Sequence, residues 1–376
     1  MSASTKPIKF NDFRGEYLEF KAEFQSAFHR VMVSGWYILG QEVQNFETEL
    51  AAYLGVKYAI GVGNGLEALQ LSLMALEIGK GDEVITTPLS AVATTLAILA
   101  VGATPVFIDT DPNGQLDADL IEAAITPRTK AIMPVDLYGF SPNYAKIIEI
   151  AKKNKLLVIE DAAQAIGSLA NGAKLGTYGD LGCFSFYPTK NLGAIGDGGA
   201  VVTNNLKLAE KIKILRDYGQ TAKYKHDHYG LNSRLDELQA AILRHKLTKL
   251  DGQNQRRRQI AQTYLDCLQK TTLTSLQNQY VTQPNYHLFI LKSESRKELQ
   301  DFLNTQGIPA LVHYPILIPE QKFIGNYPHV ATLIPKAKEL ANKILTIPIH
   351  PYLRRTEIKR ITQALLRYES LKLIVK

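Results

Sequence analysis

The sequence of 376 residues has only two cysteines, Cys183 and Cys267, which lie far apart in the chain. Two distant cysteines cannot form a disulfide framework, and they cannot supply the sulfur ligands of a structural zinc site. We therefore expect a reducing, cytoplasmic setting. His226 and His228 have a ligand-like spacing, but no third ligand is close to them in the sequence, so no metal site is predicted.

Long apolar runs are also lacking. The longest, near residues 91–101, is broken by threonines and is shorter than the roughly 20 residues that a membrane span needs. The N-terminal segment MSASTKPIKFNDF has no apolar core of the kind found in signal peptides. With 45% hydrophobic and 21% charged residues, the composition is that of a globular protein, and we expect no contact with a membrane.

Acidic residues are slightly outnumbered, with 36 against 43 basic residues and a formal net charge of +7. Apart from Arg256, Arg257 and Arg258, the basic residues are scattered. This run lies in a helical pattern, which favours a solvated helix face over a nucleic-acid site. A modest positive field also suits a small anionic substrate such as a nucleotide diphosphate.

Strands and helices alternate from Tyr58 onward. Apolar strand patterns, separated from one another by helical patterns, are YAIGVG, EVITT, TPVFID, KAIMPVDLYG and LLVIED, and two further strands are predicted at CFSF and GAVVTN. Strands that are apolar throughout are typical of a parallel sheet covered on both faces. We therefore expect an α/β fold with a mainly parallel, mixed sheet between helices.

Other patterns surround this alternation. Two helices precede it, and they are predicted to end near Gly35 and Gly55. A long helical stretch beginning at Ser233 follows it, and then come a strand at YHLFIL, a helix at SRKELQDFLNTQGI, a strand at PALVHYP and two closing helices. We expect a large domain over residues 1–250, including the N-terminal helices, and a smaller C-terminal α/β domain over residues 251–376.

A glycine-rich turn, residues 61–65 (GVGNG), follows a predicted strand and opens a helix. Backbone N–H groups at such a helix start can bind phosphate, although a plain strand-to-helix turn has the same pattern. A dinucleotide site would need an acidic residue at the end of the next strand, whereas Asp82 and Glu83 precede that strand. The sequence also lacks a G-x-x-x-x-G-K-[ST] loop, which disfavours a nucleotide triphosphatase.

A second candidate site combines a carboxylate at the end of one predicted strand with a lysine that follows another. The strand LLVIED ends on Glu160 and Asp161, and Lys190 follows the strand CFSFYP and precedes the glycine-dense NLGAIGDGG. Each could be an ordinary structural aspartate or surface lysine. Together they can hold the two ends of pyridoxal phosphate (PLP), because a carboxylate favours the protonated ring nitrogen and a lysine binds the aldehyde. Gln164 could bond the phenolic oxygen, and Ser185 the phosphate.

The motifs taken together resemble those of the DegT-type nucleotide-sugar aminotransferases, which have the PLP-dependent transferase fold of type I. The resemblance covers nearly the whole chain and rests on SGWYILG, GVGNGLEAL, GATPVFID, VDLYG, EDAAQAIG, FSFYPTKNLGAIGDGGAVVTN, GLNSRLDELQAA and VHYP. GWYILG together with GNGLEAL is most similar to the subgroup that aminates carbon 3 of dTDP-linked 3-keto-6-deoxyhexoses.

This resemblance implies roles for individual residues. Lys190 would bind PLP covalently and move protons, while Asp161 pairs with the ring nitrogen and Gln164 with the phenolic oxygen. Gly65, Leu66 and Ser185 would hold the phosphate. A homodimer with shared active sites is implied, in which Asn232 reaches the phosphate of the partner subunit. Candidates for binding the sugar nucleotide are Tyr187, Lys223, Tyr224, Arg234, His313 and Tyr314.

The chain departs from the family pattern at three positions. Ala91 stands where many members have an aromatic residue over the cofactor ring, and Ile166 and Asp136 stand where histidine is common. Lys190 itself matches the aminating members, because relatives that remove a hydroxyl group carry histidine at that place.

We therefore expect an aminotransferase that uses PLP, with glutamate as amino donor and a dTDP-linked keto sugar as acceptor, in the biosynthesis of a deoxyamino sugar for O-antigen, surface polysaccharide or antibiotic. Alternatives are amination at carbon 4, a cyclic ketone without a nucleotide, a dinucleotide-dependent oxidoreductase, and a non-catalytic regulatory relative that binds PLP or a sugar nucleotide.

Overall fold

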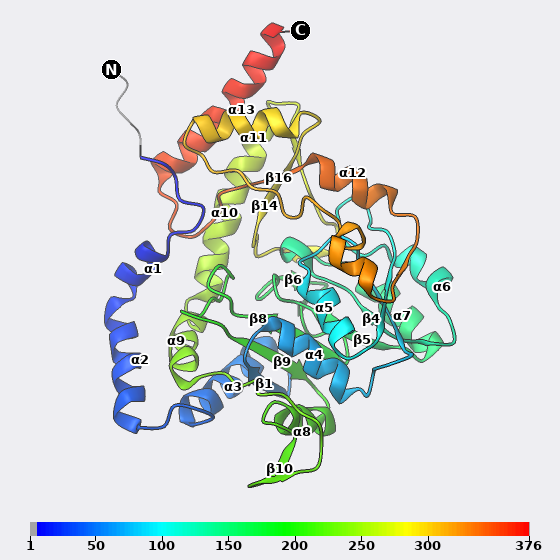
Figure 1. The fold of residues 1–376 in the computed structure, drawn as a ribbon. Helices are drawn as coiled ribbons and strands as arrows, with labels where there is room; N and C mark the ends of the chain where they lie inside the picture. Colours follow the sequence, from blue (N-terminus) through cyan, green and yellow to red (C-terminus); the bar gives the residue numbers. More distant parts are fainter. Residues whose placement is uncertain (1–5, 376) are drawn as a thin grey trace.

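A computed structural model describes residues 6–375 and shows an eight-stranded sheet at the centre of the molecule (Figure 1). From β8 to β15 all neighbours pair in parallel, whereas β9 is antiparallel to both β1 and β8. The expected mainly parallel, mixed sheet is thus confirmed. In spatial order the strands are β1 (Tyr58–Val62), β9 (Gly199–Thr203), β8 (Leu181–Ser185), β5 (Leu157–Asp161), β4 (Thr129–Met133), β2 (Glu83–Thr86), β3 (Thr104–Phe107) and β15 (Val330–Ala331).

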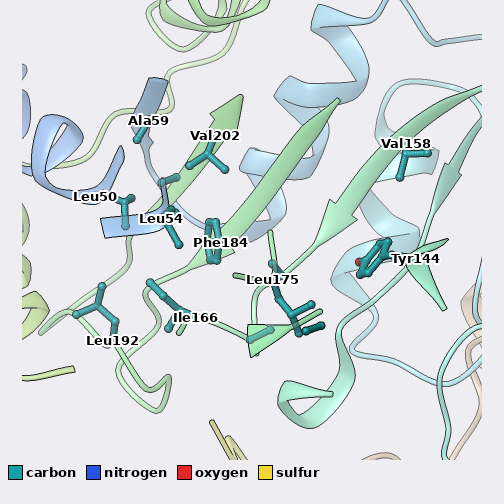
Figure 2. Packing of buried hydrophobic residues seen from close by; sticks show 14 of the residues in the cluster. Leu50, Leu54, Ala59, Tyr144, Val158, Ile166, Leu175, Phe184, Leu192 and Val202 are labelled. Carbon is teal, nitrogen blue, oxygen red and sulfur yellow. The ribbon is translucent and has the colours of Figure 1, made fainter. Parts of the chain in front are cut away.

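Helices cover both faces of this sheet, because successive strand residues point to opposite sides and both sides are apolar. On one face, Val158 and Phe184 pack with residues of α3 (Gln41–Leu54), α7 (Tyr144–Asn154) and α9 (Glu237–Leu247). Figure 2 shows part of this cluster, with Phe184 among the labelled residues of the core. On the other face, Ile159 and Cys183 pack with residues of α4 (Gly65–Ala75), α5 (Ala93–Ala100) and α8 (Leu206–Leu215).

The two predicted N-terminal helices are confirmed, and α1 (Phe13–Glu19) precedes them. The first, α2 (Lys21–Ser34), ends at Gly35, and α3 ends at Gly55. Both glycines have a left-handed backbone, with φ of 62° and 76°, which costs glycine less than any other residue.

The C-terminal part is built around a second, smaller sheet. Helix α10 (Leu250–Leu268) runs from α9 to this part of the molecule (Figure 1). Tyr264, Phe289 and Leu345 belong to its buried core. Because β15 joins the large sheet and β13 pairs with β6, this part also contacts the rest of the chain, and a domain boundary at residue 250 stays a prediction. Its strands and helices are β12 (Thr274–Ser275), β14 (Phe289–Lys292), β16 (Ile344–Ile347), α11 (Arg296–Thr305), α12 (Pro335–Lys343) and α13 (Arg355–Val375).

Short elements complete the fold. They are η1 (Ala118–Leu120), α6 (Ile121–Ala124), η2 (Leu137–Gly139), β6 (Leu169–Ala170), β7 (Ala173–Lys174), β10 (Gln220–Ala222), β11 (Lys225–His226), β13 (Val281–Gln283), η3 (Ile318–Glu320) and η4 (Lys322–Asn326). None of the helices within residues 6–375 combines the length and the apolar composition needed to cross a membrane.

Two expectations about secondary structure were wrong. The segment PALVHYP is not a strand; only Leu311 forms an isolated bridge, to Thr346. The first and last residues of this segment, Pro309 and Pro315, have no N–H group to donate to a neighbouring strand. The long helical stretch expected from Ser233 begins only at Glu237. It is not one helix but divides into α9 and α10.

The core around Phe184 gives a test of this packing. Phe184 is buried, and a Cβ placed on Gly176 would come within 2.2 Å of its ring. Phe184→Ala should cost about 3–5 kcal/mol through lost burial and the cavity left behind. A lower thermal unfolding temperature is therefore expected by calorimetry. Leu333→Ala is the control, because Leu333 is 91% exposed and its removal should leave that temperature unchanged. Equal temperatures for the two variants would contradict the packing.

Candidate active site

Asp161 is the last residue of β5 and lies at the carboxyl end of the parallel strands. It is buried, and two neutral donors bind it: the Thr94 hydroxyl at 2.7 Å and the Ala163 N–H at 3.2 Å. Burial raises the pKa of the Asp161 carboxyl, while the Thr94 and Ala163 hydrogen bonds and the Lys190 charge oppose this. A buried carboxylate without an ion-pair partner is costly, so a cation bound next to it would be stabilising.

The preceding residue, Glu160, has a structural role. Because adjacent strand residues point to opposite faces, its carboxylate lies away from that of Asp161. It accepts hydrogen bonds from the backbone N–H groups of Gly176, Tyr178 and Gly179, which hold the segment between β7 and β8. Of the acidic pair at the end of LLVIED, only Asp161 faces the candidate site.

Lys190 lies in the loop that connects β8 to β9, and its N–H donates to the Tyr187 carbonyl at 2.8 Å. Burial lowers the pKa of the Lys190 amine to about 8, and the negative charge of Asp161 opposes this change. A lysine with such a pKa is partly neutral near physiological pH, as nucleophilic attack on an aldehyde requires.

A candidate phosphate site lies at the start of α4. Asn64 caps the helix, its side chain accepting from Glu67 N at 2.9 Å, and the first N–H groups of a helix have no partner within it. Gly65 lies directly against Ser185, since a Cβ on Gly65 would come within 2.6 Å of the Ser185 Cβ. The helix N-terminus, including Leu66, and the Ser185 hydroxyl therefore meet at one place, as a phosphate requires.

Gln164 is buried between two tyrosines. Its Oε1 accepts from Tyr138 N at 2.8 Å, and its Nε2 donates to the Tyr314 hydroxyl at 3.3 Å. The Tyr138 hydroxyl donates to the His313 carbonyl, and His313 Nδ1 lies 2.9 Å from Thr346 Oγ1. Gln164, His313 and Tyr314 thus belong to one connected group.

One member of this group, His313, is close enough to Lys190 for their charges to interact. Burial lowers the pKa of His313 to about 4, and the charge of Lys190 contributes to this. Burial also raises the pKa of Tyr314 to about 12, so its hydroxyl keeps its proton. The structure therefore brings His313 and Tyr314, two of the six candidate substrate residues, into one group with Gln164.

Of the other four candidates, Tyr187 lies in the same loop as Lys190, and the remaining three lie on the chain's surface or in an ion pair. Tyr187 is 53% exposed, close to Ser185. Lys223 and Tyr224 belong to the β10–β11 hairpin at the bottom of Figure 1, where Tyr224 is 84% exposed. Arg234 forms an ion pair with Asp217 at 2.9 Å.

Asn232 is exposed, and the next residue, Ser233, accepts a hydrogen bond from Gly63 N at 3.0 Å. The segment that carries Asn232 therefore lies next to the glycine-rich turn of its own chain. A contact of Asn232 with a partner subunit stays a prediction.

The three positions that depart from the family pattern have distinct surroundings. Ala91 lies in the loop that leads into α5, and the hydroxyl of Thr94 in the first turn of that helix donates to Asp161, so this region contributes a hydroxyl to the site rather than an aromatic ring. Asp136 is buried and accepts from the Tyr144 hydroxyl at 2.8 Å. Ile166 is buried in the core of the large sheet.

Sequence patterns did not reveal Thr94 or Tyr138. Thr94 lies within an apolar helix and is 67 positions from Asp161, so no local spacing links the two. Tyr138 reads as the end of a strand, yet its φ of 64° turns its N–H toward Gln164. Among residues 6–375, no group of three or more histidine, cysteine, aspartate or glutamate side chains has the arrangement of a metal site.

These residues fit PLP. A buried carboxylate suits the ring nitrogen, an amine of lowered pKa suits the aldehyde, and a helix start against a serine suits the phosphate. The fold and the site define a PLP-dependent aminotransferase.

Comparisons with known proteins lead to the same class. Residues 19–366 match the DegT/DnrJ/EryC1/StrS aminotransferase family, and the chain belongs to it. It is 45% identical over 370 residues to the dTDP-3-amino-3,6-dideoxy-alpha-D-galactopyranose transaminase of Aneurinibacillus thermoaerophilus, covering 96% of this chain and 99% of that protein. It is 43% identical to the dTDP-3-amino-3,4,6-trideoxy-alpha-D-glucose transaminase of Streptomyces venezuelae, covering 96% of each.

Two further similarities concern substrate and structure. A UDP-N-acetyl-3-dehydro-alpha-D-glucosamine 3-aminotransferase of Acidithiobacillus ferrooxidans is 41% identical, covering 96% of this chain and 97% of that protein. The crystal structure of S. venezuelae DesV in complex with a ketimine intermediate matches with a TM-score of 0.94 and 41% identity, covering 97% of this chain and 99% of that one. The chain is therefore a sugar aminotransferase of this family that depends on PLP.

The lowered pKa of Lys190 predicts how the apoprotein takes up PLP. Only the neutral amine attacks the aldehyde, and its fraction rises with pH around the lysine pKa. The rate of covalent PLP uptake, followed by absorbance, should therefore rise through pH about 8 and level off above it. An ordinary lysine would level off only above about 10.4. A rate still rising steeply at pH 10 would contradict the burial of this amine.

Proposed function

We propose that the enzyme aminates carbon 3 of a dTDP-linked 3-keto-6-deoxyhexose and takes the amino group from glutamate. The observation that carries the chemistry is the placement of Asp161 and Lys190 in one buried site, each affecting the pKa of the other. The choice of carbon 3 and of dTDP is supported by the two relatives that are named for dTDP-3-amino sugars.

Each residue of the site would have a separate task. Asp161 keeps the ring nitrogen protonated, so that the bound cofactor can stabilise negative charge at the carbon that loses a proton. Lys190 takes that proton and returns it to a neighbouring carbon, first for the amino donor and then, in reverse, for the keto sugar. Gln164 would orient the phenolic side of the ring, and the N–H groups of Gly65 and Leu66 with the Ser185 hydroxyl would hold the phosphate.

The remaining candidates would bind the substrate. His313 and Tyr314 belong to the group around Gln164 and would contact the sugar ring, with the neutral imidazole and the protonated phenol as hydrogen-bonding groups. Lys223 and Arg234 would pair with the phosphates of the nucleotide, and Tyr187 and Tyr224 would pack against the sugar nucleotide.

A homodimer is part of this proposal. Large apolar side chains are exposed on α2 and in the turn after it, among them Phe28, Trp36 and Tyr37, with Trp36 62% exposed. Exposed apolar groups on this scale favour association with another copy. In such a dimer Asn232 would reach the phosphate site of the partner subunit. A cytoplasmic location likewise stays a prediction.

A UDP-linked 3-keto sugar is the second candidate substrate, favoured by the relative that is named for such a sugar. Both candidates place the new amino group on carbon 3. The sugar nucleotide in that relative's name differs from the first candidate in the base, in the ribose 2′-hydroxyl and in the groups on carbons 2 and 6 of the hexose.

A panel of nucleotide keto sugars separates these possibilities. With glutamate as donor, the 3-keto-6-deoxyhexose linked to dTDP should be aminated with a kcat/KM at least about tenfold above its UDP counterpart, a difference of about 1.4 kcal/mol in transition-state binding. NMR of the product should place nitrogen on carbon 3. Nitrogen on carbon 4 would overturn the choice of position, and a preference for UDP would overturn the choice of nucleotide.

Lys190→Ala tests the chemistry itself. The variant should lose the absorption band of the lysine-bound cofactor, and kcat should fall by several orders of magnitude, because the nucleophile and the proton carrier are both removed. Lys57→Ala, at an exposed lysine, is the matched control and should keep band and turnover. Turnover in Lys190→Ala equal to that of the control would contradict the assignment of Lys190 as the catalytic lysine.

A further inference from the structure

A buried group of amides and one imidazole lies next to Lys190 and takes no part in the roles described above. Asn191 follows Lys190 directly, and its side chain contacts three residues from the part of the chain beyond residue 250. Its Nδ2 donates to Asn254 Oδ1 at 2.8 Å and to the Asn285 carbonyl at 3.0 Å. Its Oδ1 lies 3.1 Å from His287 Nδ1.

The hydrogen bonds decide which nitrogen of His287 carries the proton. Both N–H groups of Asn191 Nδ2 are used by oxygen acceptors, so its Oδ1 must accept from His287. Turning the Asn191 amide over would place its oxygen against two other oxygens, which is unfavourable. His287 Nδ1 is therefore the donor, which fixes the tautomer of a neutral ring.

His287 also stays uncharged. It is buried, and burial lowers the pKa of its ring well below the usual histidine range, with the charges of Lys190, Arg257 and His313 acting in the same direction. The groups that affect it thus come from the Lys190 loop, from α10 and from the segment after α11. A neutral imidazole next to Lys190 adds no positive charge to the site.

The same group anchors the loop that carries Gln164. Asn285 Nδ2 donates to the carbonyls of Gln164 at 3.0 Å and Ile166 at 3.1 Å, and Asn254 Nδ2 donates to Ile166 O at 3.2 Å. Asn285 Oδ1 in turn accepts from His287 N at 2.9 Å. Each side-chain nitrogen and oxygen of the two asparagines has at least one hydrogen-bond partner, and a buried network of this kind is rigid.

Glycines make room for this network. A Cβ on Gly139 would lie 1.9 Å from Asn285 Oδ1, and one on Gly167 would lie 2.6 Å from Asn254 Nδ2. Both glycines have positive φ, of 92° and 78°. The backbone of the large-sheet part is therefore shaped to admit two amide side chains from beyond residue 250.

We propose that His287 is a positioning residue for transamination. It acts through Asn191 to hold Lys190 at a fixed position relative to Gln164 across the cofactor site. Lys190 and Gln164 come from different loops, and the network of Asn191, Asn254, Asn285 and His287 is bonded to both. This inference rests on the proposed role of Lys190. The part of the chain beyond residue 250 thereby sets the position of that lysine.

The test compares His287→Leu with His287→Asn. Leucine has no donor for Asn191, whereas the Nδ2 of asparagine can take the place of the histidine Nδ1. His287→Leu should lower kcat about tenfold, as expected for one lost hydrogen bond of roughly 1.4 kcal/mol, with little change in the KM for the keto sugar. Covalent uptake of PLP by the apoprotein should slow in parallel. His287→Asn should recover most of both losses.

His245→Leu is the matched control, since His245 lies on α9 and packs edge-on against Phe20 at 5.0 Å between ring centroids. It should leave kcat and PLP uptake unchanged. If His287→Leu lowers only the thermal unfolding temperature, the role is merely structural and the proposal is overturned. A His287→Asn variant as impaired as His287→Leu would overturn it too.

A measurement on the unaltered apoprotein needs no turnover, and a variant is used only to assign the signal. In ¹⁵N NMR of histidine-labelled protein at neutral pH, with the resonance assigned by its absence in His287→Asn, the His287 proton should reside on Nδ1. A proton on Nε2 would contradict the inference even if the proposed function holds. Conversely, a protein that shows the Nδ1–H signal but aminates none of the sugars would contradict the proposed function alone.

Discussion

The site depends on one buried carboxylate, that of Asp161. An ionised carboxylate loses several kcal/mol when it leaves water, and the two neutral donors that bind Asp161 offset only part of this. A positive charge at the same place would offset the rest. The protonated ring nitrogen of PLP would supply such a charge if it is bound as proposed, so the cofactor would stabilise Asp161 and Asp161 would keep the cofactor protonated. The pKa of Lys190 is lowered for a related reason, because burial also disfavours the charged form of the lysine.

The topology of the large sheet explains why distant residues meet at Asp161. Parallel neighbours β5 and β8 end at the same edge and place Asp161 near Ser185. The turn after β1 brings the start of α4 against Ser185. Helix α5, which follows β2, supplies Thr94 from its first turn, and the loop after β8 carries Lys190. Each group comes from the end of a different element, so the sheet positions them without contributing catalytic groups from its interior.

Several of these features could be predicted from the sequence because they follow from local patterns. The continuous apolar strands indicated a mainly parallel sheet. Asp161 and Lys190 were predicted to share a site because Asp161 ends a strand and Lys190 follows one, next to a glycine-dense segment. The strand expected at PALVHYP was wrong. The prolines at its two ends cannot donate backbone hydrogen bonds, and only one isolated bridge forms. Thr94, Tyr138 and His287 could not be found in this way. Their partners lie far away in the sequence, and their surroundings show the ordinary patterns of a helix, a strand end and a strand start.

The most direct test of the central claim is to locate the covalent bond to the cofactor. Purified protein with PLP bound would be reduced with borohydride, digested and analysed by mass spectrometry. The account predicts one modified peptide, which contains residues 186–198 and carries the pyridoxyl group on Lys190. A pyridoxyl group on any other lysine, or bound PLP that borohydride does not attach to the chain, would contradict it.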